Sequence, residues 1–201
     1  MKIGPKYKIA RRLGVPIFEK TQTQKYALSL ARKEKSGKTR MRPKSEFGLQ
    51  LLEKQKARFT YGVGERQFRG YVERARKSDK PQDKLYNQLE RRLDNVVYRS
   101  GFTKTRAQAR QAVSHGHLLL NAKRVTIPSI TLKEGDKVSI RAGSGASMLW
   151  STLDERLKEV TGPAWIKVDP VAREISVVAL PVLVPVEQVF DLGAVIEFYN
   201  R

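Results

Sequence analysis

Apolar side chains recur at helical spacing in the middle of the chain. Leu49, Leu52 and Phe59 fall on one face of a helix that Ser45 can cap at its N-terminus, and the pattern stops at residues 61–62. A second helix is predicted over residues 65–77, with apolar residues on its inner face and arginines mostly on its outer face. Its inner positions are Phe68, Tyr71, Val72 and Ala75.

The apolar pattern of residues 85–97 predicts a further amphipathic helix. Gly101 can end this helix as the left-handed residue beyond its last turn. Thr105 and Gln108 fit a capping box for the next helix, which ends at Gly116. The inward positions of the two helices are Leu85, Leu89, Leu93, Val96, Val97, Ala109, Ala112 and Val113.

Beyond residue 117, short aliphatic and β-branched runs alternate with turn residues, which is typical of a small sheet. Strands are predicted at residues 118–120, 125–127, 138–140, 165–168 and 174–180, with a loop at 143–145 and a helix at 149–160. Residues 189–199 are too apolar for a free tail, so we expect them to pack back on another part of the chain. The predicted fold class is therefore α+β, with a mainly helical N-terminal domain and an inserted module in which helices cover a small, mostly antiparallel sheet.

The first 44 residues differ from the rest because cations are dense and glycines and prolines interrupt the pattern. We predict one short helix, at residues 25–34, in an otherwise extended or irregular basic arm that orders against its partner. The predicted division of the chain is an arm at 1–44, a helical domain at 45–90, a module with a sheet extension at 91–180, and a C-terminal segment at 181–201 that packs back on the helical domain.

The charge of the chain points to the kind of partner. The 201 residues include 40 Lys and Arg against 20 Asp and Glu, a formal net charge of +20. Residues 1–84 hold 24 basic and 8 acidic side chains and residues 91–141 hold 11 and 3, whereas residues 142–201 hold 5 and 8. A field of this size favours anionic partners, of which nucleic acids and acidic membrane surfaces are the usual ones.

Several classes of protein are disfavoured by what the sequence lacks. No apolar run approaches the ~20 residues of a membrane span, and lysines and arginines interrupt every apolar stretch before residue 26, where a signal peptide would lie. The chain has no cysteine, which excludes disulfides and thiolate metal sites. We therefore expect a soluble intracellular protein.

Arg106 and Arg110 are the strongest candidates for contacts to phosphate. They lie four residues apart on the outer face of one predicted helix, and a guanidinium offers forked donors to phosphate oxygens at any relevant pH. A solvated helix face is the alternative, but the surrounding excess of positive charge favours binding. Arg92 and Arg99 are less specific candidates, because each could instead pair with a neighbouring acid such as Asp94.

Catalytic and metal-binding interpretations have less support. His115 and His117 are the two histidines of the chain, and without cysteines or matched carboxylates they give too few ligands for a closed metal site. Residues 62–64 lack the Gly-Lys-Ser/Thr end of a phosphate loop and fit a turn between helices better. Asp94 has no partner acid at a suitable spacing, so an ion pair or a cap is expected there. We predict no catalytic residue, metal or cofactor.

Several motifs resemble those of known RNA-binding proteins. The module resembles the RNA-binding module of the S-four family, and the flanking regions resemble the bacterial-type small-subunit ribosomal protein four family. The motifs of the module are Arg92-Leu93-Asp94-Asn95-Val96-Val97-Tyr98-Arg99, Gln108-Ala109-Arg110-Gln111, His115-Gly116-His117, Val125, Ile127-Pro128-Ser129 and Gly135-Asp136. The flanking motifs are Gly4-Pro5, Arg11-Arg12, Leu49-Gln50-Leu51, Glu53-Lys54-Gln55-Lys56, Tyr61-Gly62-Val63, Gln67-Phe68, Ile196-Glu197-Phe198-Tyr199 and Arg201.

The resemblance runs through nearly the whole chain and is most specific over residues 45–140. It implies a structural constituent of the small ribosomal subunit, a primary rRNA-binding protein that nucleates assembly of the subunit body and influences translational accuracy. It also implies contacts with neighbouring small-subunit proteins and with mRNA where it enters the subunit, in the cytoplasm or in an organellar stroma. Many relatives hold zinc with four cysteines in the arm. Tyr7 and Ala10 stand in place of the first pair here, which indicates the zinc-free branch.

The candidate RNA-contacting residues are mostly cations of these motifs, together with Tyr61, which could stack on a base although aromatic residues at helical spacing are more often core. In the arm they are Lys2, Lys8, Arg11, Arg12, Arg40, Arg42 and Lys44. In the helical domain they are Lys54, Lys56, Arg58, Tyr61, Arg66 and Arg69. In the module they are Arg92, Arg99, Lys104, Thr105, Arg106, Arg110, His115 and Lys123.

Three alternative functions share part of this pattern. A non-ribosomal RNA-binding factor could use the same module, but the motifs within residues 53–68 favour the ribosomal protein. A pseudouridine synthase would need a catalytic Asp in a separate large domain, and residues 142–201 are too few to form one. A membrane-surface protein would concentrate its cations on one long amphipathic helix, which the sequence does not predict.

Overall fold

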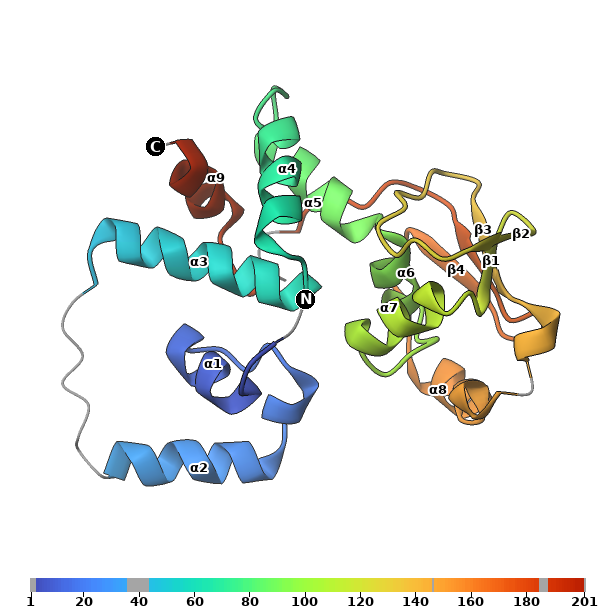
Figure 1. Cartoon of the computed structure of the whole chain (residues 1–201), viewed down its shortest axis with the longest axis horizontal. Coiled ribbons are helices and arrows are strands. Elements are labelled where there is room, and N and C mark those ends of the chain that lie inside the picture. Colours follow the sequence, from blue (N-terminus) through green and yellow to red (C-terminus); the bar gives the residue numbers. More distant parts are fainter. Residues whose placement is uncertain (1–2, 36–43, 146, 185–187, 201) are drawn as a thin grey trace. The chain divides into compact units, whose positions relative to one another are not determined.

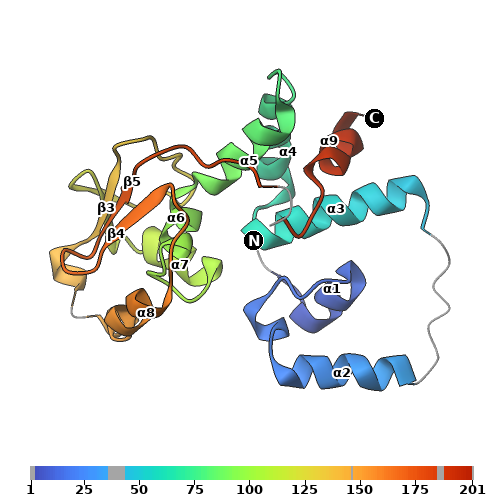
Figure 2. The ribbon, with the colours of Figure 1, turned by 180° about the vertical axis from the view of Figure 1, so that it is seen from behind.

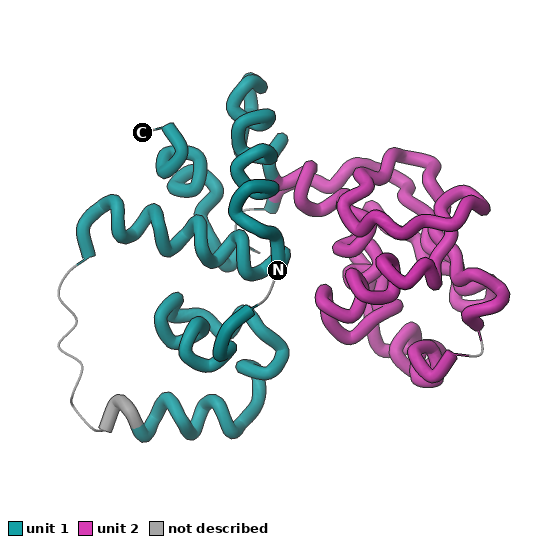
Figure 3. The backbone as a smooth tube through the Cα atoms, viewed as in Figure 1, with its two compact units in different colours: residues 1–85, 184–201 teal, residues 86–183 magenta. Residues whose placement is uncertain are grey.

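The computed structural model describes residues 3–35, 44–145, 147–184 and 188–200 (Figure 1). The chain divides into two compact units (Figure 3). Unit 1 comprises residues 1–85 and 184–201, and unit 2 comprises residues 86–183. Unit 2 is thus inserted into the sequence of unit 1. The four-part division given above, with its separate arm, stays a prediction.

Unit 1 is helical. Its elements are α1 (Lys6–Leu13), the short 3-10 helix η1 (Glu19–Thr21), α2 (Gln24–Lys35), α3 (Glu46–Tyr61), α4 (Glu65–Ala75), the first part of α5 (Pro81–Glu90) and α9 (Leu192–Asn200). α3 begins as predicted, with Ser45 Oγ accepting a hydrogen bond from Gly48 N at 3.2 Å. It ends at Gly62, whose φ of 62° lies in the left-handed region. The extents predicted for α3 and α4 are therefore confirmed, as is the inner face of α4. The apolar face predicted for α3 is not its buried face, because Leu49 is exposed and Gln50, Lys54, Ala57 and Tyr61 are buried instead.

The C-terminal helix α9 packs on α3 and α4 within unit 1 (Figure 1). The ring centres of Phe198 and Phe47 lie 5.3 Å apart, and Gln50 Nε2 donates a hydrogen bond to Glu197 Oε2 at 3.1 Å. Aromatic contacts and a buried polar contact thus hold the end of the chain against helices that lie far earlier in the sequence.

The N-terminal arm is more ordered than the sequence predicts. α2 confirms the one helix expected there, but α1 is a second helix. Ala10, Phe18 and Tyr26 form a small buried core, and the Phe18 ring lies edge-on to Phe59 of α3, with ring centres 6.2 Å apart. The prediction of irregular structure was therefore wrong for residues 6–13, because a few apolar side chains between the cations suffice to bury this segment against α3.

Unit 2 combines helices with a five-stranded sheet, which confirms the predicted α+β class. Its elements are the rest of α5, α6 (Leu93–Arg99), α7 (Arg106–Ser114), β1 (Leu118–Leu120), β2 (Lys123–Val125), β3 (Lys137–Ile140), η2 (Ala142–Ser144), η3 (Met148–Trp150), α8 (Leu153–Glu159), β4 (Ile166–Asp169) and β5 (Glu174–Val177). The strand order is β2-β1-β3-β5-β4, and all neighbouring strands are antiparallel. Leu118 of β1 pairs with Val125 on one side and Ile140 on the other.

One hydrophobic core joins the helices of unit 2 to its sheet. Val96 of α6, Val113 of α7, Leu118 of β1, Val138 of β3 and Ile175 of β5 are all fully buried in it. Accordingly, α6 and α7 lie beside the sheet in both views of the ribbon (Figure 1, Figure 2). Each helix buries its apolar stripe in this core, which leaves its other face for polar side chains.

The single helix predicted over residues 85–97 is two helices, α5 and α6. The backbone at Arg92 is extended and forms an isolated antiparallel bridge with Thr131. Leu93 N donates a hydrogen bond to Ile130 O at 2.8 Å, so the strand-like pairing replaces the helical hydrogen bonds at this point. The prediction was wrong because the apolar spacing continues through the break.

Two smaller differences concern the end of the module. The strand predicted at residues 125–127 lies two residues earlier, as β2, because Asn121 and Ala122 form a tight turn with φ of 49° and 64°. The helix predicted over residues 149–160 is shorter: only α8 is α-helical, and the 3-10 helix η3 precedes it. The strands predicted near β1, β3, β4 and β5 are confirmed.

Candidate RNA-binding surface

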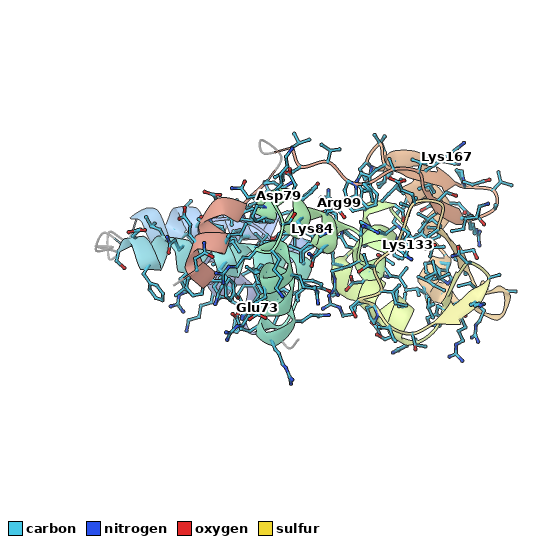
Figure 4. All side chains as sticks on the ribbon, turned by 90° about the horizontal axis from the view of Figure 1, so that it is seen from above. Glu73, Asp79, Lys84, Arg99, Lys133 and Lys167 are labelled. Carbon is cyan, nitrogen blue, oxygen red and sulfur yellow. The ribbon has the colours of Figure 1, made fainter. Side chains whose placement is uncertain are left out.

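Buried acids hold arginines on the outer side of α6 and α7. The side chains of Glu90 and Asp94 are 0% and 3% exposed. A carboxylate in such an environment needs charged or hydrogen-bonding partners, because burial removes its hydration. Guanidinium groups supply them in both cases, and Figure 4 labels one of these arginines, Arg99.

Asp94 binds two arginines that differ in exposure. Arg92 Nε and Nη2 donate to Asp94 Oδ1 and Oδ2 at 3.0 and 2.8 Å, and Arg110 Nε and Nη2 both donate to Oδ2, at 2.9 and 2.6 Å. The side chain of Arg92 is 2% exposed, whereas that of Arg110 is 28% exposed. Arg92 therefore serves the fold, whereas Arg110 reaches the surface, and an RNA contact by Arg92 stays a prediction that its burial does not favour.

Glu90 binds Arg99 directly and is linked to Arg106 through Asn95. Arg99 Nε and Nη2 donate to Glu90 Oε2 and Oε1 at 3.1 and 3.0 Å, and Asn95 Nδ2 donates to Glu90 Oε2 at 3.0 Å. Asn95 Oδ1 in turn accepts a hydrogen bond from Arg106 Nε at 2.8 Å. The Arg106 guanidinium lies 4.3 Å from the ring centre of Tyr98. Polar contacts thus orient Arg106 as well as Arg99 and Arg110.

The N-terminus of α7 adds a further positive group. Thr105 Oγ1 accepts a hydrogen bond from Gln108 N at 3.0 Å, so the predicted N-cap is confirmed. The reciprocal bond of a capping box is not formed, because Gln108 Oε1 accepts from Lys104 N at 2.9 Å and not from Thr105 N. The Thr105 hydroxyl is therefore used by the cap. The Lys104 side chain is exposed at the positive end of the helix dipole, where an anion is favoured.

Arg124 and Lys123 extend the basic surface beyond the end of α7. Arg124 lies directly on Gly116: a Cβ atom placed on this glycine would lie 2.4 Å from Arg124 Nε. Arg124 Nη2 also lies 3.5 Å from His115 O. Both β2 cations and His115 are exposed. Arg124 was not among the predicted contact residues, although its position beside Lys123 next to a tight turn is a sequence signal for an exposed cation there.

His117 is held beside these groups at the start of β1. Its Nδ1 lies 3.1 Å from Ser144 Oγ, to which Arg141 Nε donates at 3.3 Å. Burial, together with the nearby charges of His115, Arg141 and Arg124, lowers the pKa of His117 below its ordinary value. The imidazole is therefore neutral near pH 7, so it has one donor and one acceptor nitrogen.

In unit 1, several predicted contact residues also take part in contacts that stabilise the fold. The side chain of Lys54 is 8% exposed, and its Nζ lies 3.1 Å from Glu65 Oε1 and 4.4 Å from the ring centre of Phe198. Arg58 Nη1 donates to Glu65 Oε2 at 2.5 Å. Tyr61 is 3% exposed in the core. This burial favours structural roles for both residues, and the RNA contact of Lys54 and the base stacking of Tyr61 stay predictions that are not carried into the proposal below.

Glu65 joins α3, α4 and α9. Tyr199 Oη donates to Glu65 Oε1 at 2.6 Å. Burial by itself raises the pKa of Glu65, but hydrogen bonds from Tyr199, Lys54 and Arg58 lower it by more, and the pKa ends below its ordinary value. Burial and the bond to Glu65 raise the pKa of Tyr199. This cluster is an anchor for the C-terminal helix.

The other predicted cations of unit 1 lie nearer the surface. Lys56 Nζ lies 2.6 Å from Glu53 Oε1, and Arg11 Nε donates to Tyr7 O at 3.1 Å, so both are partly used within the unit. The exposed candidates are Lys8, Arg12, Lys44, Arg66 and Arg69, the last of which pairs with Glu73, labelled in Figure 4. The candidates Lys2, Arg40 and Arg42 lie outside the described residues.

Two kinds of feature are absent from the described part of the chain. No three or more His, Cys, Asp or Glu side chains gather there in a way that could hold a metal ion. None of the helices in that part is long and apolar enough to cross a membrane.

Comparison with known families defines the class of protein. Residues 91–138 match the family described as the S4 domain, and residues 1–94 match the family described as the ribosomal protein S4/S9 N-terminal domain. The S4 match coincides with α6, α7 and the first three strands, where the anchored arginines lie. The chain is thus an S4-domain protein with the N-terminal region of a ribosomal protein.

Whole-chain relatives narrow this class to one family. The small ribosomal subunit protein uS4 of Roseiflexus castenholzii is 43% identical over 202 residues, with 99% of this chain and 98% of the relative covered. The corresponding proteins of Chloroflexus aurantiacus and Chlorobaculum tepidum are 41% identical over 202 residues and 40% identical over 204, with at least 96% of each chain covered. The chain belongs to the uS4 family of small ribosomal subunit proteins, which confirms the resemblance found in the sequence.

Proposed function

We propose that this protein is a structural, non-catalytic constituent of the small ribosomal subunit that binds ribosomal RNA. RNA binding is supported chiefly by the partly exposed arginines that buried acids hold on α6 and α7. A guanidinium that is already oriented loses less side-chain entropy when it meets a phosphate than a freely rotating one does. Membership of the uS4 family supports the ribosomal part.

The proposed contact residues are the candidates whose side chains reach the surface. In unit 2 they are Arg99, Lys104, Arg106, Arg110, His115, Lys123 and Arg124. In unit 1 they are Lys8, Arg11, Arg12, Lys44, Lys56, Arg58, Arg66 and Arg69. Contacts to phosphate supply affinity and make it depend on salt, whereas the fixed spacing of the cations selects one RNA shape, because the deep major groove of an RNA helix hides its base edges.

Further roles follow from this mode of binding. A protein that stabilises one arrangement of converging RNA helices gives later proteins a folded surface to bind, so it would act as a primary binder that nucleates assembly of the subunit body. We include among its partners the neighbouring small-subunit proteins and mRNA near the channel by which mRNA enters, and hence an influence on translational accuracy. We place it on ribosomes in the cytoplasm or in an organellar stroma.

Binding to a defined RNA tests the proposal. The full chain is titrated with a fragment of small-subunit rRNA that contains a multi-helix junction, and with an unrelated structured RNA of equal length, across a salt series. Binding through about 6–10 phosphates should lose about 10³–10⁵ in affinity between 50 and 200 mM salt for both RNAs. The junction fragment should remain preferred at each salt concentration. Equal affinity for both RNAs at every salt concentration would mean that the protein binds RNA only as a nonspecific polycation, which would contradict the proposal.

A further inference from the structure

A pocket with a volume of about 230 Å³ lies at the C-terminal end of α7 in unit 2. Its lining residues are Gln108, Gln111, Ala112, His115, His117 and Leu149. The lining comes from α7, from the segment between α7 and β1, and from η3. We propose that this pocket takes a single unpaired nucleobase of the bound RNA. This inference rests on the proposed function and goes beyond phosphate contacts.

The size of the pocket fits a base better than a larger ligand. Drug-sized ligands occupy sites of about 300–1,000 Å³, above the volume found here. A water molecule takes about 30 Å³ of liquid, so the space equals the volume of about eight waters. A base that is splayed out of an RNA loop is a planar group of this intermediate size, and unpaired bases are what proteins read in RNA.

The lining has the chemistry that a base requires. Ala112 and Leu149 give apolar surface for the faces of the ring, while the carboxamides of Gln108 and Gln111 can meet its hydrogen-bonding edge. Gln108 Oε1 already accepts from the Lys104 amide, so its Nε2 is the group left to act as a donor. The pocket therefore combines stacking surface with fixed polar groups.

The two imidazoles add a stacking surface and a hydrogen-bonding group. The ring centres of His115 and His117 lie 5.9 Å apart with the planes at 47°, so the rings contact each other and leave no slot for a base between them. Ser144 engages Nδ1 of His117, and Nε2 of this ring has no hydrogen-bonding partner among the described residues. As a neutral imidazole it can meet either a donor or an acceptor on a base, depending on its tautomer.

Cations beside the pocket can bind the backbone of the same nucleotide. The Arg124 side chain lies against Gly116, which is the residue between His115 and His117. Arg141 donates a hydrogen bond to Ser144, the residue that also contacts His117. The phosphate of a nucleotide whose base occupies the pocket would thus lie close to these guanidinium groups, which can bind it.

Abasic substitution tests this assignment on the full chain. Each unpaired nucleotide of the junction fragment is replaced in turn by an abasic nucleotide, and affinity is measured for the wild type, for Gln111→Ala and for the control Ser114→Ala. Ser114 is exposed on the same helix but does not line the pocket. One abasic position should weaken wild-type binding about tenfold, in the range typical of a stacked base.

The variants separate the pocket from the rest of the surface. Gln111→Ala should weaken binding to the intact fragment severalfold and should largely remove the effect of that one abasic position, because both changes delete the same interaction. Ser114→Ala should leave both results unchanged. If the wild type prefers the junction fragment but no abasic position responds to Gln111→Ala, the pocket is not a base site, although the proposed function stands. If the wild type does not prefer the junction fragment over the unrelated RNA, the proposed function is wrong, and the base site that rests on it is wrong as well.

Discussion

Replacing Asp94 by Asn should destabilise unit 2 by about 3–5 kcal/mol, the usual cost of leaving a buried charge without its partner. The amide keeps the shape of the carboxylate but loses the charge that compensates Arg92, whose side chain is 2% exposed. Arg110 is 28% exposed and can turn to water. Most of the loss should therefore come from the Arg92 guanidinium, which cannot reach solvent without opening the core.

Tryptophan fluorescence in urea gives the assay. The two tryptophans of the chain, Trp150 and Trp165, lie in unit 2 and are buried in its core, so their emission follows this unit and not unit 1. For a slope of about 1.5 kcal/mol per molar urea, the midpoint should fall by about 2–3 M. Adding Arg92→Met to Asp94→Asn should recover much of the loss, because the uncompensated charge is then gone.

The matched control is Asp154→Asn in the same unit. Asp154 Oδ2 lies 2.7 Å from Arg173 Nη2, but the two side chains are 60% and 37% exposed. An exposed pair of this kind contributes about 0–1 kcal/mol, so the midpoint should move little. Equal midpoints for Asp94→Asn and Asp154→Asn would refute the view that Asp94 compensates a buried charge.

Three further changes test other parts of the structure. Gly116→Ala should destabilise unit 2 by about 1–2 kcal/mol in the same urea assay, because φ is 71° there and the new Cβ would meet Arg124. Arg124→Ala should weaken RNA binding severalfold and lower the salt slope by about one, while the control Arg173→Ala should not. Glu65→Gln should speed hydrogen exchange of the α9 amides at pH 7. Because the folded pKa of Glu65 is lowered, its contribution is present above its unfolded pKa of about 4.3 and is lost as pH falls through the folded value, where variant and wild type should converge.

Local pattern predicted most of the fold because most elements carry their own signals. Ser45 and Thr105 cap helices as expected, and the apolar spacing of α4 and α7 matches the buried faces. The break at Arg92 could not be predicted in this way, because it depends on pairing with Thr131, which lies far along the chain. The fold of α1 also depends on burial against α3, but Tyr7, Ala10 and Leu13 recur there at helical spacing and Gly14 ends the helix, so a local signal was present and was not used.

The candidate site was harder to predict, because one residue type has two roles. Arg92 and Arg110 bind the same carboxylate, and only the backbone at Arg92 places one of them in the interior. Lys54 looks like an RNA-contacting cation in the sequence, yet it completes a cluster with α9. Counting cations in the motifs therefore overestimates the phosphate contacts, since each buried cation adds to net charge but not to counterion release. The slope of affinity against salt should follow the exposed, oriented cations, so variants of Arg92 that still fold should leave the slope unchanged and Arg110→Ala should lower it.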